Sequence, residues 1–517
     1  MARQDKKIIL FCCSLTGNRN TDGTFNNRGT NTNFWSSTEG TTGAWKRNLN
    51  TSYTTVNRND NNKAYGFSVR CLKDWLEMIE MLSESEHLYH QKIRENKGMM
   101  KVITGVPKQD SEKQLLYDLF QAYYTARKNK RSTVNALKFE MYYESKLFQL
   151  YDEIKNRKYE VSPSICFISF EPVQREIFAG DFRDRIVHHL IYNYISPLFE
   201  RLFIHDSYSC RVGKGTSCGI KRLDYFIRSC SRNYRQDCYI LKLDIEGYFM
   251  SMERSILYEK IEKVLQRFAE VANFDTELVL HLIRKVIFHD ARKHCIIKGT
   301  KEDWKGLPKS KSLFYSEENR GLPIGNLTSQ LFGNVYLNDF DHFIKYHLGI
   351  KYYSRYVDDF VIVHPDKEYL KSTIPILREY LKTHLLLELH PKKIYLQHFS
   401  KGVNFLGTAI KPYRIYIGNR TKGSFYKKIQ YWNNLLMGKQ YKLNKEDEKQ
   451  FLSTMNSYLG IMQHYNTYKL RKKMLRRNLS GYFWKYVYIS NNYGKLAAKI
   501  RKTGVAYLPY EESKGKR

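Results

Sequence analysis

The chain has 517 residues, which is enough to bury at least one large core and suggests two to four domains or subdomains, so a peptide or a small disulfide-held fold is excluded. Its 86 Lys and Arg residues against 52 Asp and Glu residues give a formal net charge of +34, and 15% of its residues are aromatic, including 41 Tyr. This combination indicates a polyanionic partner, and rings that stack on bases favour a nucleic acid over a membrane surface.

Nine cysteines are scattered along the chain without a CxxC pair. We therefore expect reduced thiols and a cytoplasmic protein rather than a zinc site or a disulfide framework. Residues 8–15 follow Lys6 and Lys7 and have the outline of a short signal-peptide core, but they are too short to span a bilayer and no clean cleavage site follows. No other stretch approaches transmembrane length, so we expect no membrane association.

Residues 1–74 are rich in Asn, Thr, Gly and Ser, with twelve Asn among them, and lack the apolar periodicity that builds a core. Two interpretations stay open. The segment is either a disordered polar leader or a folded segment, because residues 35–38 (WSST) and 66–71 (GFSVRC) resemble the closing portion of C-type-lectin-like surface proteins that carry a variable region.

The next stretch has a helical pattern. Residues 75–110 are interpreted as a helical linker, because apolar residues form a stripe among acidic ones. A second helix is expected over 112–128 and ends in a basic cluster, 127–131, that is either a solvated face or an RNA contact. Residues 139–180 predict a helix and then strands, and a long helix is expected to begin at Asp181.

The central part of the chain holds the candidate site. The run 239–243 (YILKL) predicts a strand that ends at Asp244, followed by Ile245 and a Gly-Tyr-Phe turn. Residues 321–330 (GLPIGNLTSQ) predict a turn that feeds a helix, where glycines let the backbone approach a ligand and the Thr, Ser and Gln groups can bind a base or sugar.

Two β-prone runs, 351–356 and 360–364, enclose the acidic tip Tyr356-Val357-Asp358-Asp359 and predict a hairpin. Two carboxylates at the end of a buried ribbon repel each other, and a divalent cation is the usual reason to keep both ionised. Asp244 supplies the third carboxylate that such a metal site requires. After a new β element at 404–407, residues 420–517 are predicted to be helical, basic and rich in Tyr, which suits a surface that follows a phosphate backbone.

Asp244 with Phe249, the 321–330 segment, the Tyr356–Asp359 tip, Lys393 and residues 405–407 occur in the order of the reverse transcriptase motifs. Over residues 110–475 the chain resembles a reverse transcriptase. The resemblance implies an α+β right-hand polymerase with fingers and an antiparallel-sheet palm at 111–415 and a helical, basic thumb and tail at 416–517.

The resemblance also implies the roles of individual residues. Asp244, Asp358 and Asp359 are expected to be catalytic, and Asp244, Ile245 and Asp358 are expected to bind two Mg²⁺ ions. Phe249 is expected to exclude ribonucleotides and Lys393 to assist the departure of pyrophosphate. The remaining contacts expected for the dNTP substrate and base are Arg183, Arg211, Ile324, Gly325 and Gln330.

Residues 324–330 (IGNLTSQ) resemble the reverse transcriptases of diversity-generating retroelements, whereas retron and group II intron enzymes typically carry Gln-Gly and Ser-Pro in this segment. Ile324 stands where the common residue is Gln. This resemblance implies that a template-repeat RNA is copied with errors at adenines into cDNA that replaces a variable region of a target gene. It also implies an accessory variability determinant protein as a partner. Because Asn codons begin with two adenines, residues 1–74 fit a translated template repeat. Two alternatives stay open: a group II intron or retron-type reverse transcriptase, and a catalytically silent RNA-binding protein.

Overall fold

The computed structural model describes residues 111–128, 133–171 and 173–499, together with the backbone of five strands between Asn18 and Asn61. The chain divides into two compact units, residues 1–106 and 107–517. The expected helical linker at 75–110 lies outside the described residues.

The first unit contains antiparallel strands. Strand β1 (Asn18–Arg19) pairs with β2 (Phe25–Asn26), and a three-stranded sheet has the order β3 (Asn31–Glu39), β4 (Ala44–Asn50), β5 (Asn57–Asn61). These parts of the Asn-rich segment therefore form strands, which contradicts an unstructured leader there, while the lectin-like origin stays a prediction.

The second unit begins with the part that the resemblance assigns to the fingers. Helices α3 (Ser111–Arg127), α4 (Val134–Glu140) and α5 (Tyr143–Lys155) precede a sheet of order β7–β6–β9. Strands β6 (Ser164–Ser169) and β7 (Arg175–Ala179) form a hairpin, and β9 (Cys295–Ile297) adds in parallel to β6 from a distant part of the sequence. The long helix α6 (Phe182–Leu202) begins where expected, with the Asp181 carboxylate accepting from the backbone N–H of Arg183.

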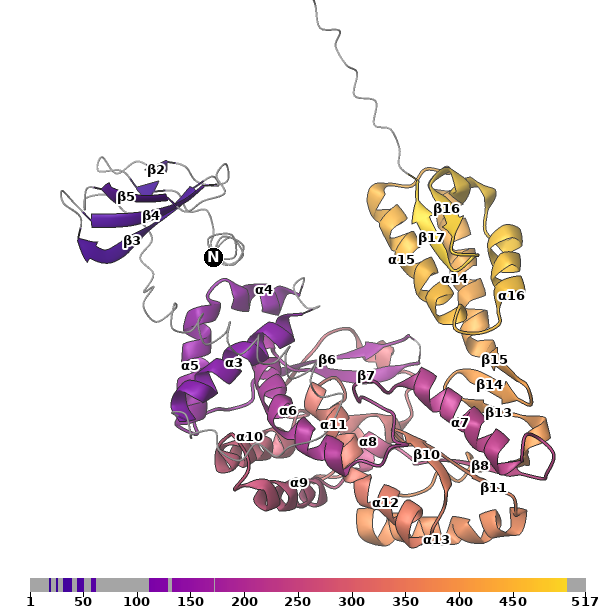
Figure 1. Ribbon diagram of the computed structural model, residues 1–517. Helices are drawn as coiled ribbons and strands as arrows, with labels where there is room; N and C mark the ends of the chain where they lie inside the picture. The colour runs from indigo at the N-terminus through magenta and orange to yellow at the C-terminus, as the bar shows by residue number, and fades with distance from the viewer. Residues whose placement is uncertain are drawn as a thin grey trace, which may run out of the picture. The chain divides into compact units, whose positions relative to one another are not determined.

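The palm is a four-stranded antiparallel sheet of order β10–β11–β8–β12, formed by β8 (Tyr239–Asp244), β10 (Tyr352–Tyr356), β11 (Asp359–His364) and β12 (Tyr395–His398). Figure 1 shows α12 (Asn338–His342) and α13 (Lys367–Leu385) together beside these strands. Its other helices are α7 (Thr216–Cys230), α8 (Tyr248–Ser251), α9 (Arg254–Phe268), α10 (Thr276–Phe288) and α11 (Leu327–Tyr336).

Both faces of the palm sheet are buried. Successive side chains of a strand point to opposite faces, and each set packs into a core of its own. In β8, Leu241 and Leu243 belong to the core that includes the leucines of α13, whereas Ile240 belongs to a second core beneath α7. Phe360 and Val361 divide in the same way on β11. The expected buried ribbon is confirmed, and it fixes where the strand ends lie.

The C-terminal part has a core of its own and is not purely helical. A sheet of β13 (Val403–Phe405), β14 (Thr408–Lys411) and β15 (Arg414–Ile417) leads into α14 (Asn419–Gly438), α15 (Lys445–Met462) and α16 (Tyr468–Lys473). A hairpin of β16 (Val487–Ser490) and β17 (Lys495–Ala498) follows, and Leu496 packs into the same core as Phe425 and Phe451. The helical prediction missed this hairpin, whose strands are only four residues long.

Short 3₁₀ and π turns complete the described fold: η1 (Lys301–Trp304), η2 (Lys309–Lys311), η3 (Leu313–Tyr315), η4 (Phe343–His347), η5 (Phe399–Lys401), η6 (Met474–Asn478) and η7 (Gly481–Lys485). Among the helices that the structure describes, none combines the length and apolar character needed to cross a membrane.

Candidate active site

Strand register brings the three predicted carboxylates together. Asp244 is the last residue of β8 and Asp359 the first of β11, and the antiparallel register pairs the two directly. Directly opposed residues in such a ladder have Cβ atoms about 5 Å apart. Asp358 lies in the turn that joins β10 to β11, next to this pair. Three acidic side chains from two distant parts of the sequence therefore meet at one edge of the palm.

The three carboxylates repel one another. Burial, followed by the charges of Asp244 and Asp359, raises the pKa of Asp358 to about 6. Burial also raises the pKa of Asp359, although Lys242, whose Nζ lies 3.2 Å from Asp359 Oδ1, acts in the opposite direction. The site therefore favours any cation that enters it.

Lys393 provides part of the missing positive charge. Its Nζ donates to Asp244 Oδ1 over 2.7 Å, and its side chain is 43% exposed. Burial lowers the pKa of Lys393, but its hydrogen bond to Asp244 and the nearby charges of Asp358 and Asp359 outweigh burial and raise it. Lys393 is thus held at the carboxylates as a firmly protonated ammonium group.

A short backbone bridge holds residues 388–390, which lead to Lys393, against the end of β8. The His390 N–H donates to the Asp244 carbonyl (2.9 Å) and the Glu246 N–H donates to the Glu388 carbonyl (2.9 Å). Ile245 and Leu389 face each other between these bonds, so the bridge does not use the Ile245 carbonyl. That carbonyl is the group through which Ile245 can serve as a ligand.

The donors fit a hard divalent cation. Carboxylate oxygens of Asp244 and Asp358 and a backbone carbonyl at Ile245 are the oxygen ligands that Mg²⁺ prefers. Within the described residues, no three His, Cys, Asp or Glu side chains are gathered as a preassembled metal site. Lys242 and Lys393 instead each hold one oxygen of a carboxylate, Asp359 Oδ1 and Asp244 Oδ1, so a cation at Asp244 Oδ1 would compete with Lys393.

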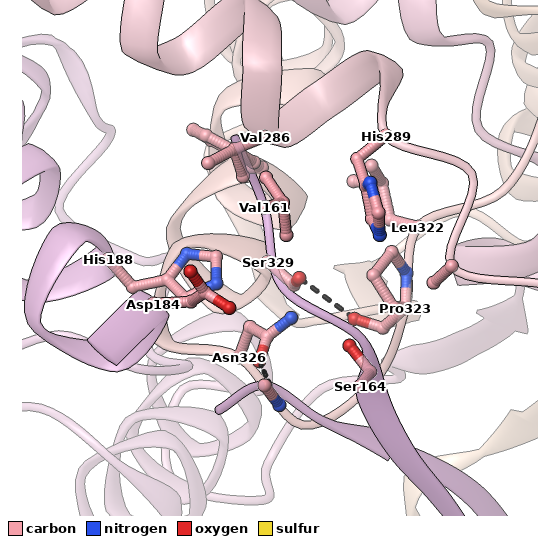
Figure 2. A pocket seen from close by; sticks show the side chains of 13 residues that line it. Val161, Ser164, Asp184, His188, Val286, His289, Leu322, Pro323, Asn326 and Ser329 are labelled. Atoms are coloured by element: carbon pink, nitrogen blue, oxygen red, sulfur yellow. Dashed lines mark hydrogen bonds between the residues drawn. The ribbon is translucent and has the colours of Figure 1, made fainter. Parts of the chain in front are cut away.

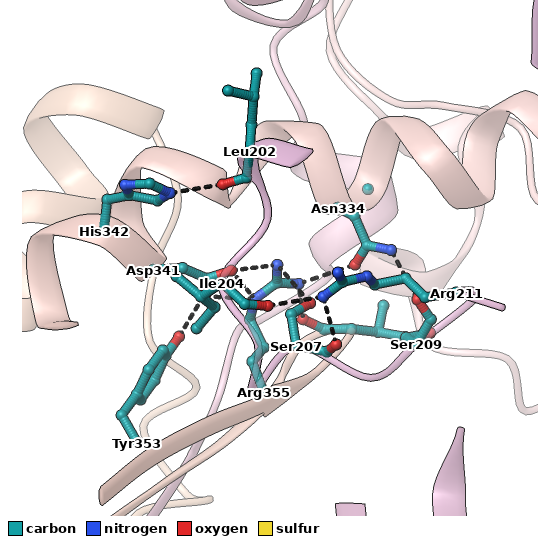
Figure 3. A network of polar contacts seen from close by, with 12 residues as sticks. Leu202, Ile204, Ser207, Ser209, Arg211, Asn334, Asp341, His342, Tyr353 and Arg355 are labelled. Carbon is teal, nitrogen blue, oxygen red and sulfur yellow. Dashed lines mark hydrogen bonds and ion pairs between the residues drawn. The ribbon is translucent and has the colours of Figure 1, made fainter. Parts of the chain in front are cut away.

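A buried polar network supports the acidic turn (Figure 3). The Arg355 guanidinium is fully buried and donates to both carboxylate oxygens of Asp341, to the Val357 carbonyl (3.0 Å) and to Asn334 Oδ1 (3.3 Å). Val357 has a φ of 56°, an unfavourable conformation for a β-branched residue that costs roughly 1–2 kcal/mol. The network therefore holds the strained turn that carries Asp358.

Phe249 and Ile324 belong to one apolar cluster, with Phe178 and Leu313 among its buried members. The Ile324 carbonyl accepts from the Phe178 N–H (2.8 Å), which fixes the 321–330 segment on β7 of the fingers. Gly325 has a φ of 135°, and a Cβ there would lie 2.6 Å from the Phe178 carbonyl oxygen, so only glycine fits. The structure thus brings these three predicted residues together between fingers and palm.

The polar residues after Gly325 are used differently from the expectation. The buried Thr328 hydroxyl bonds to His188 Nδ1 (2.9 Å), and the buried Ser329 hydroxyl donates to the Pro323 carbonyl (2.8 Å). Neither hydroxyl is free to bind a base or sugar, which corrects that part of the prediction. Gln330, by contrast, is exposed in the first turns of α11.

Behind this segment lies a small cavity of about 20 Å³ with a mixed polar and apolar lining, which has room for one water molecule. Figure 2 shows its lining, which includes the polar side chains of Asp184, His188, His289 and Asn326. The Asn326 side chain accepts from the Gly180 N–H (3.2 Å), so the cavity belongs to the support of the segment rather than to a ligand site.

Arg183 and Arg211 have protein partners of their own. Arg183 pairs with Glu153, donates to the Glu160 carbonyl (3.0 Å) and lies over the Tyr159 ring. Arg211 pairs with Glu200 (2.9 Å) and donates to two backbone carbonyls of the Ile204–Ser207 stretch. The structure does not join either guanidinium to the carboxylates, and their triphosphate role stays a prediction.

Sequence reasoning missed two supporting groups. Lys242 lies two residues before Asp244 on β8, and this spacing places both on one face of the strand. A lone lysine in an otherwise apolar strand was the available signal. Asp341 and Arg355 carried no such signal, because their pairing depends on how α12 packs against β10.

A known family model matches the part of the chain that holds this site. Residues 175–410 match the family model described as "Reverse transcriptase (RNA-dependent DNA polymerase)", and no curated protein matches the chain. Among similar solved structures is an apo telomerase of Candida tropicalis truncated from its C-terminal domain, with 14% identity, a TM-score of 0.35, and coverage of 50% of this chain and 56% of that one.

Another is a telomerase of Candida albicans in complex with a fragment of telomeric RNA, with 13% identity, a TM-score of 0.36, and coverage of 62% of this chain and 60% of that one. The chain thus spans less than two thirds of either telomerase. The family match covers all three carboxylates, Asp244, Asp358 and Asp359. Residues 175–410 are therefore similar to a reverse transcriptase domain.

Proposed function

We propose that the chain copies a template RNA into cDNA by Mg²⁺-dependent addition of dNTPs to a primer. The observation that carries this proposal is the direct pairing of Asp244 with Asp359 beside Asp358. The primer 3′-oxygen forms a bond to the α-phosphorus of the dNTP, and the bond from that phosphorus to pyrophosphate breaks. When bound, two Mg²⁺ ions activate the 3′-hydroxyl and neutralise charge on the leaving group.

The residues have distinct tasks in this proposal. Asp244 and Asp358 would hold the cations, and Asp359 would add negative charge behind them. Lys393, once displaced from Asp244, offers an ammonium group to the departing pyrophosphate. Phe249 lies beside the 321–330 segment, where its ring would contact the sugar of the incoming nucleotide.

We further infer that the template is a template-repeat RNA, that errors concentrate at its adenines, and that the cDNA serves mutagenic retrohoming into a target gene. Ile324 supports this inference, because a side chain without hydrogen-bonding atoms cannot check the geometry of a base pair through a donor or acceptor. The Asn-rich segment 1–74 is consistent with translated template-repeat sequence. An accessory variability determinant protein and a cytoplasmic location belong to the same proposal.

Primer extension on a defined RNA template, followed by sequencing of the cDNA, tests both the proposed polymerase activity and the proposed retroelement function. Extension that requires Mg²⁺ supports polymerisation, and errors at template adenines well above those at the other three bases support the retroelement function. Equal errors at all four bases would favour a group II intron or retron-type enzyme. No extension under any condition would favour the silent RNA-binding protein.

A further inference from the structure

The connection between α10 and α11 is rich in lysine over residues 293–311, which are called the lysine-rich insertion below. Residues 293–311 contain six lysines against two acids, Glu302 and Asp303, a formal net charge of +4 from 6 − 2. All six are exposed, and the structure shows none of their ammonium groups in an ion pair with a described residue: Lys293, Lys298, Lys301, Lys305, Lys309 and Lys311. Elsewhere in the palm, lysines such as Lys242 and Lys345 do pair with carboxylates.

The insertion is fixed to the fingers by a buried carboxylate. Glu176 on β7 is 1% exposed and accepts from Trp304 Nε1 (2.7 Å), the Ser312 hydroxyl (2.7 Å) and the Leu313 N–H (2.6 Å). Gln174 adds a bond to the Asp303 carbonyl (2.7 Å). Charge-assisted bonds of this kind, made away from water, hold a loop in one geometry. The exposed lysines are therefore presented on a rigid support.

The same insertion packs against the turn that follows Asp244. Gly247 comes three residues after Asp244, and a Cβ on it would lie 2.8 Å from the Ser310 carbonyl oxygen. Lys309 and Lys311 flank Ser310 in η2, so these two cations lie on backbone that packs directly against the turn after Asp244. The chain that follows the insertion is held as well, because the Gly321 N–H donates to the Met252 carbonyl (2.8 Å).

An exposed ring accompanies the cations. Tyr315 is 64% exposed, and Lys309 Nζ lies 5.3 Å from its ring centroid. The adjacent Phe314 packs against Phe178 of β7 with centroids 5.6 Å apart. Cations interleaved with an exposed aromatic ring are the combination that binds single-stranded nucleic acid, through phosphates and a stacked base.

We propose that residues 293–315 bind the phosphate backbone of the single-stranded template RNA next to the position of nucleotide addition. This inference rests on the proposed polymerase function. Because the insertion is attached to β7 of the fingers and not to the thumb, it is assigned to the template strand before copying rather than to the product duplex. Four net positive charges and one exposed Tyr match a polyanion with bases better than they match a protein surface.

The test compares three full-length double variants for binding of a fluorescent single-stranded RNA oligonucleotide, by anisotropy at several KCl concentrations. Lys309→Gln/Lys311→Gln removes the two lysines beside Ser310. Lys309→Arg/Lys311→Arg keeps their charge. Lys367→Gln/Lys382→Gln removes two exposed lysines of α13 and matches the change in net charge.

We expect the first variant to weaken binding roughly five- to tenfold at 100 mM KCl and to reduce the slope of log K against log salt by about 0.7 for each phosphate that the protein no longer neutralises. The arginine variant should bind as the wild type does, and the α13 variant should weaken binding less than twofold. Tyr315→Ala should weaken binding with an unchanged salt slope, because stacking releases no counterions.

Wild-type affinity and salt slope in the first variant would overturn the proposal. Equal weakening of binding in the first variant and the α13 control would also overturn it, because net charge alone would then account for the effect. Thermal unfolding of each variant verifies that it is folded. The polymerase function fails separately, if the wild-type protein binds the RNA but extends no primer on it.

Discussion

Arg355 and Asp341 form a bidentate ion pair in which neither side chain is exposed, with Nε 2.8 Å and Nη2 2.6 Å from the two carboxylate oxygens. The same guanidinium reaches the Val357 carbonyl with its remaining nitrogen. One side chain therefore joins α12 to the strained turn that carries Asp358.

Arg355→Lys should lower kcat for primer extension roughly tenfold to a hundredfold, because an ammonium group cannot hold Asp341 bidentately and bind Val357 at once. KM for the dNTP should change less than kcat, since Arg355 does not reach the substrate. Arg378→Lys, an exposed change of the same type on α13, is the control. Equal kcat for the two variants would show that the network does not position the turn.

Asp358→Ala should abolish Mg²⁺-dependent extension of a primed RNA template, with a reduction of at least about a thousandfold, because a carboxylate ligand of the cations is removed. Binding of the primed template should persist. Asp339→Ala, at an exposed carboxylate on α12, should retain activity. Retained activity in Asp358→Ala would refute its role as a metal ligand.

Phe249→Val should relax discrimination against ribonucleotides by at least roughly tenfold, since the smaller side chain leaves space for a 2′-hydroxyl. The Phe249 ring lies 3.3 Å from the position of a Cβ on Gly333, so it is held against α11 and cannot simply turn aside in the wild type. Single-nucleotide incorporation with dNTP and rNTP measures the ratio, and Phe148→Val on α5 is the control. An unchanged ratio would leave Phe249 as a packing residue only.

Ile324→Gln should lower misincorporation at template adenines, because an amide restores a hydrogen-bonding group beside the base pair. Ile324→Leu keeps the position apolar and should leave the error spectrum unchanged. Sequencing of cDNA from all three proteins gives error rates at each template base. If adenine errors persist in Ile324→Gln at the wild-type level, the origin of the mutagenesis lies elsewhere.

His188 should make the domain sensitive to acid. Burial, followed by the charges of His189, Arg185 and His289, lowers the pKa of His188 to about 3. The unfolded chain therefore takes up a proton near pH 6.5 that the folded protein refuses, so stability is full above pH 6.5 and falls as the pH drops from 6.5 toward 3. Between pH 6.5 and about pH 5 this amounts to about 2 kcal/mol at most.

His188→Gln keeps a group that can bond the Thr328 hydroxyl but does not titrate. The fall in apparent Tm between about pH 7.5 and about pH 5 should be smaller in this variant than in the wild type. A replacement of the exposed His347 by Gln serves as the control and should leave the pH dependence as it is. Parallel Tm curves for wild type and His188→Gln would contradict the assignment.

The palm and its acidic turn were predictable because they depend on local patterns. An apolar run of strand length ends at Asp244 and another begins at Asp359, so both carboxylates were expected at strand ends. The uses of Thr328, Ser329 and Arg183 were not predictable, since each depends on a partner that only packing brings close. The same holds for β9, whose three residues join a hairpin formed much earlier in the chain.

The close approach of Gly247 to Ser310 restricts how this protein can be re-engineered. Because the Ser310 carbonyl occupies the space beside Gly247, the lysine-rich insertion and the turn after Asp244 have complementary shapes. Shortening the insertion to obtain a minimal polymerase would leave a vacant space behind the Asp244 turn. A chimera that exchanges one of the two segments should therefore also receive the other from the same parent.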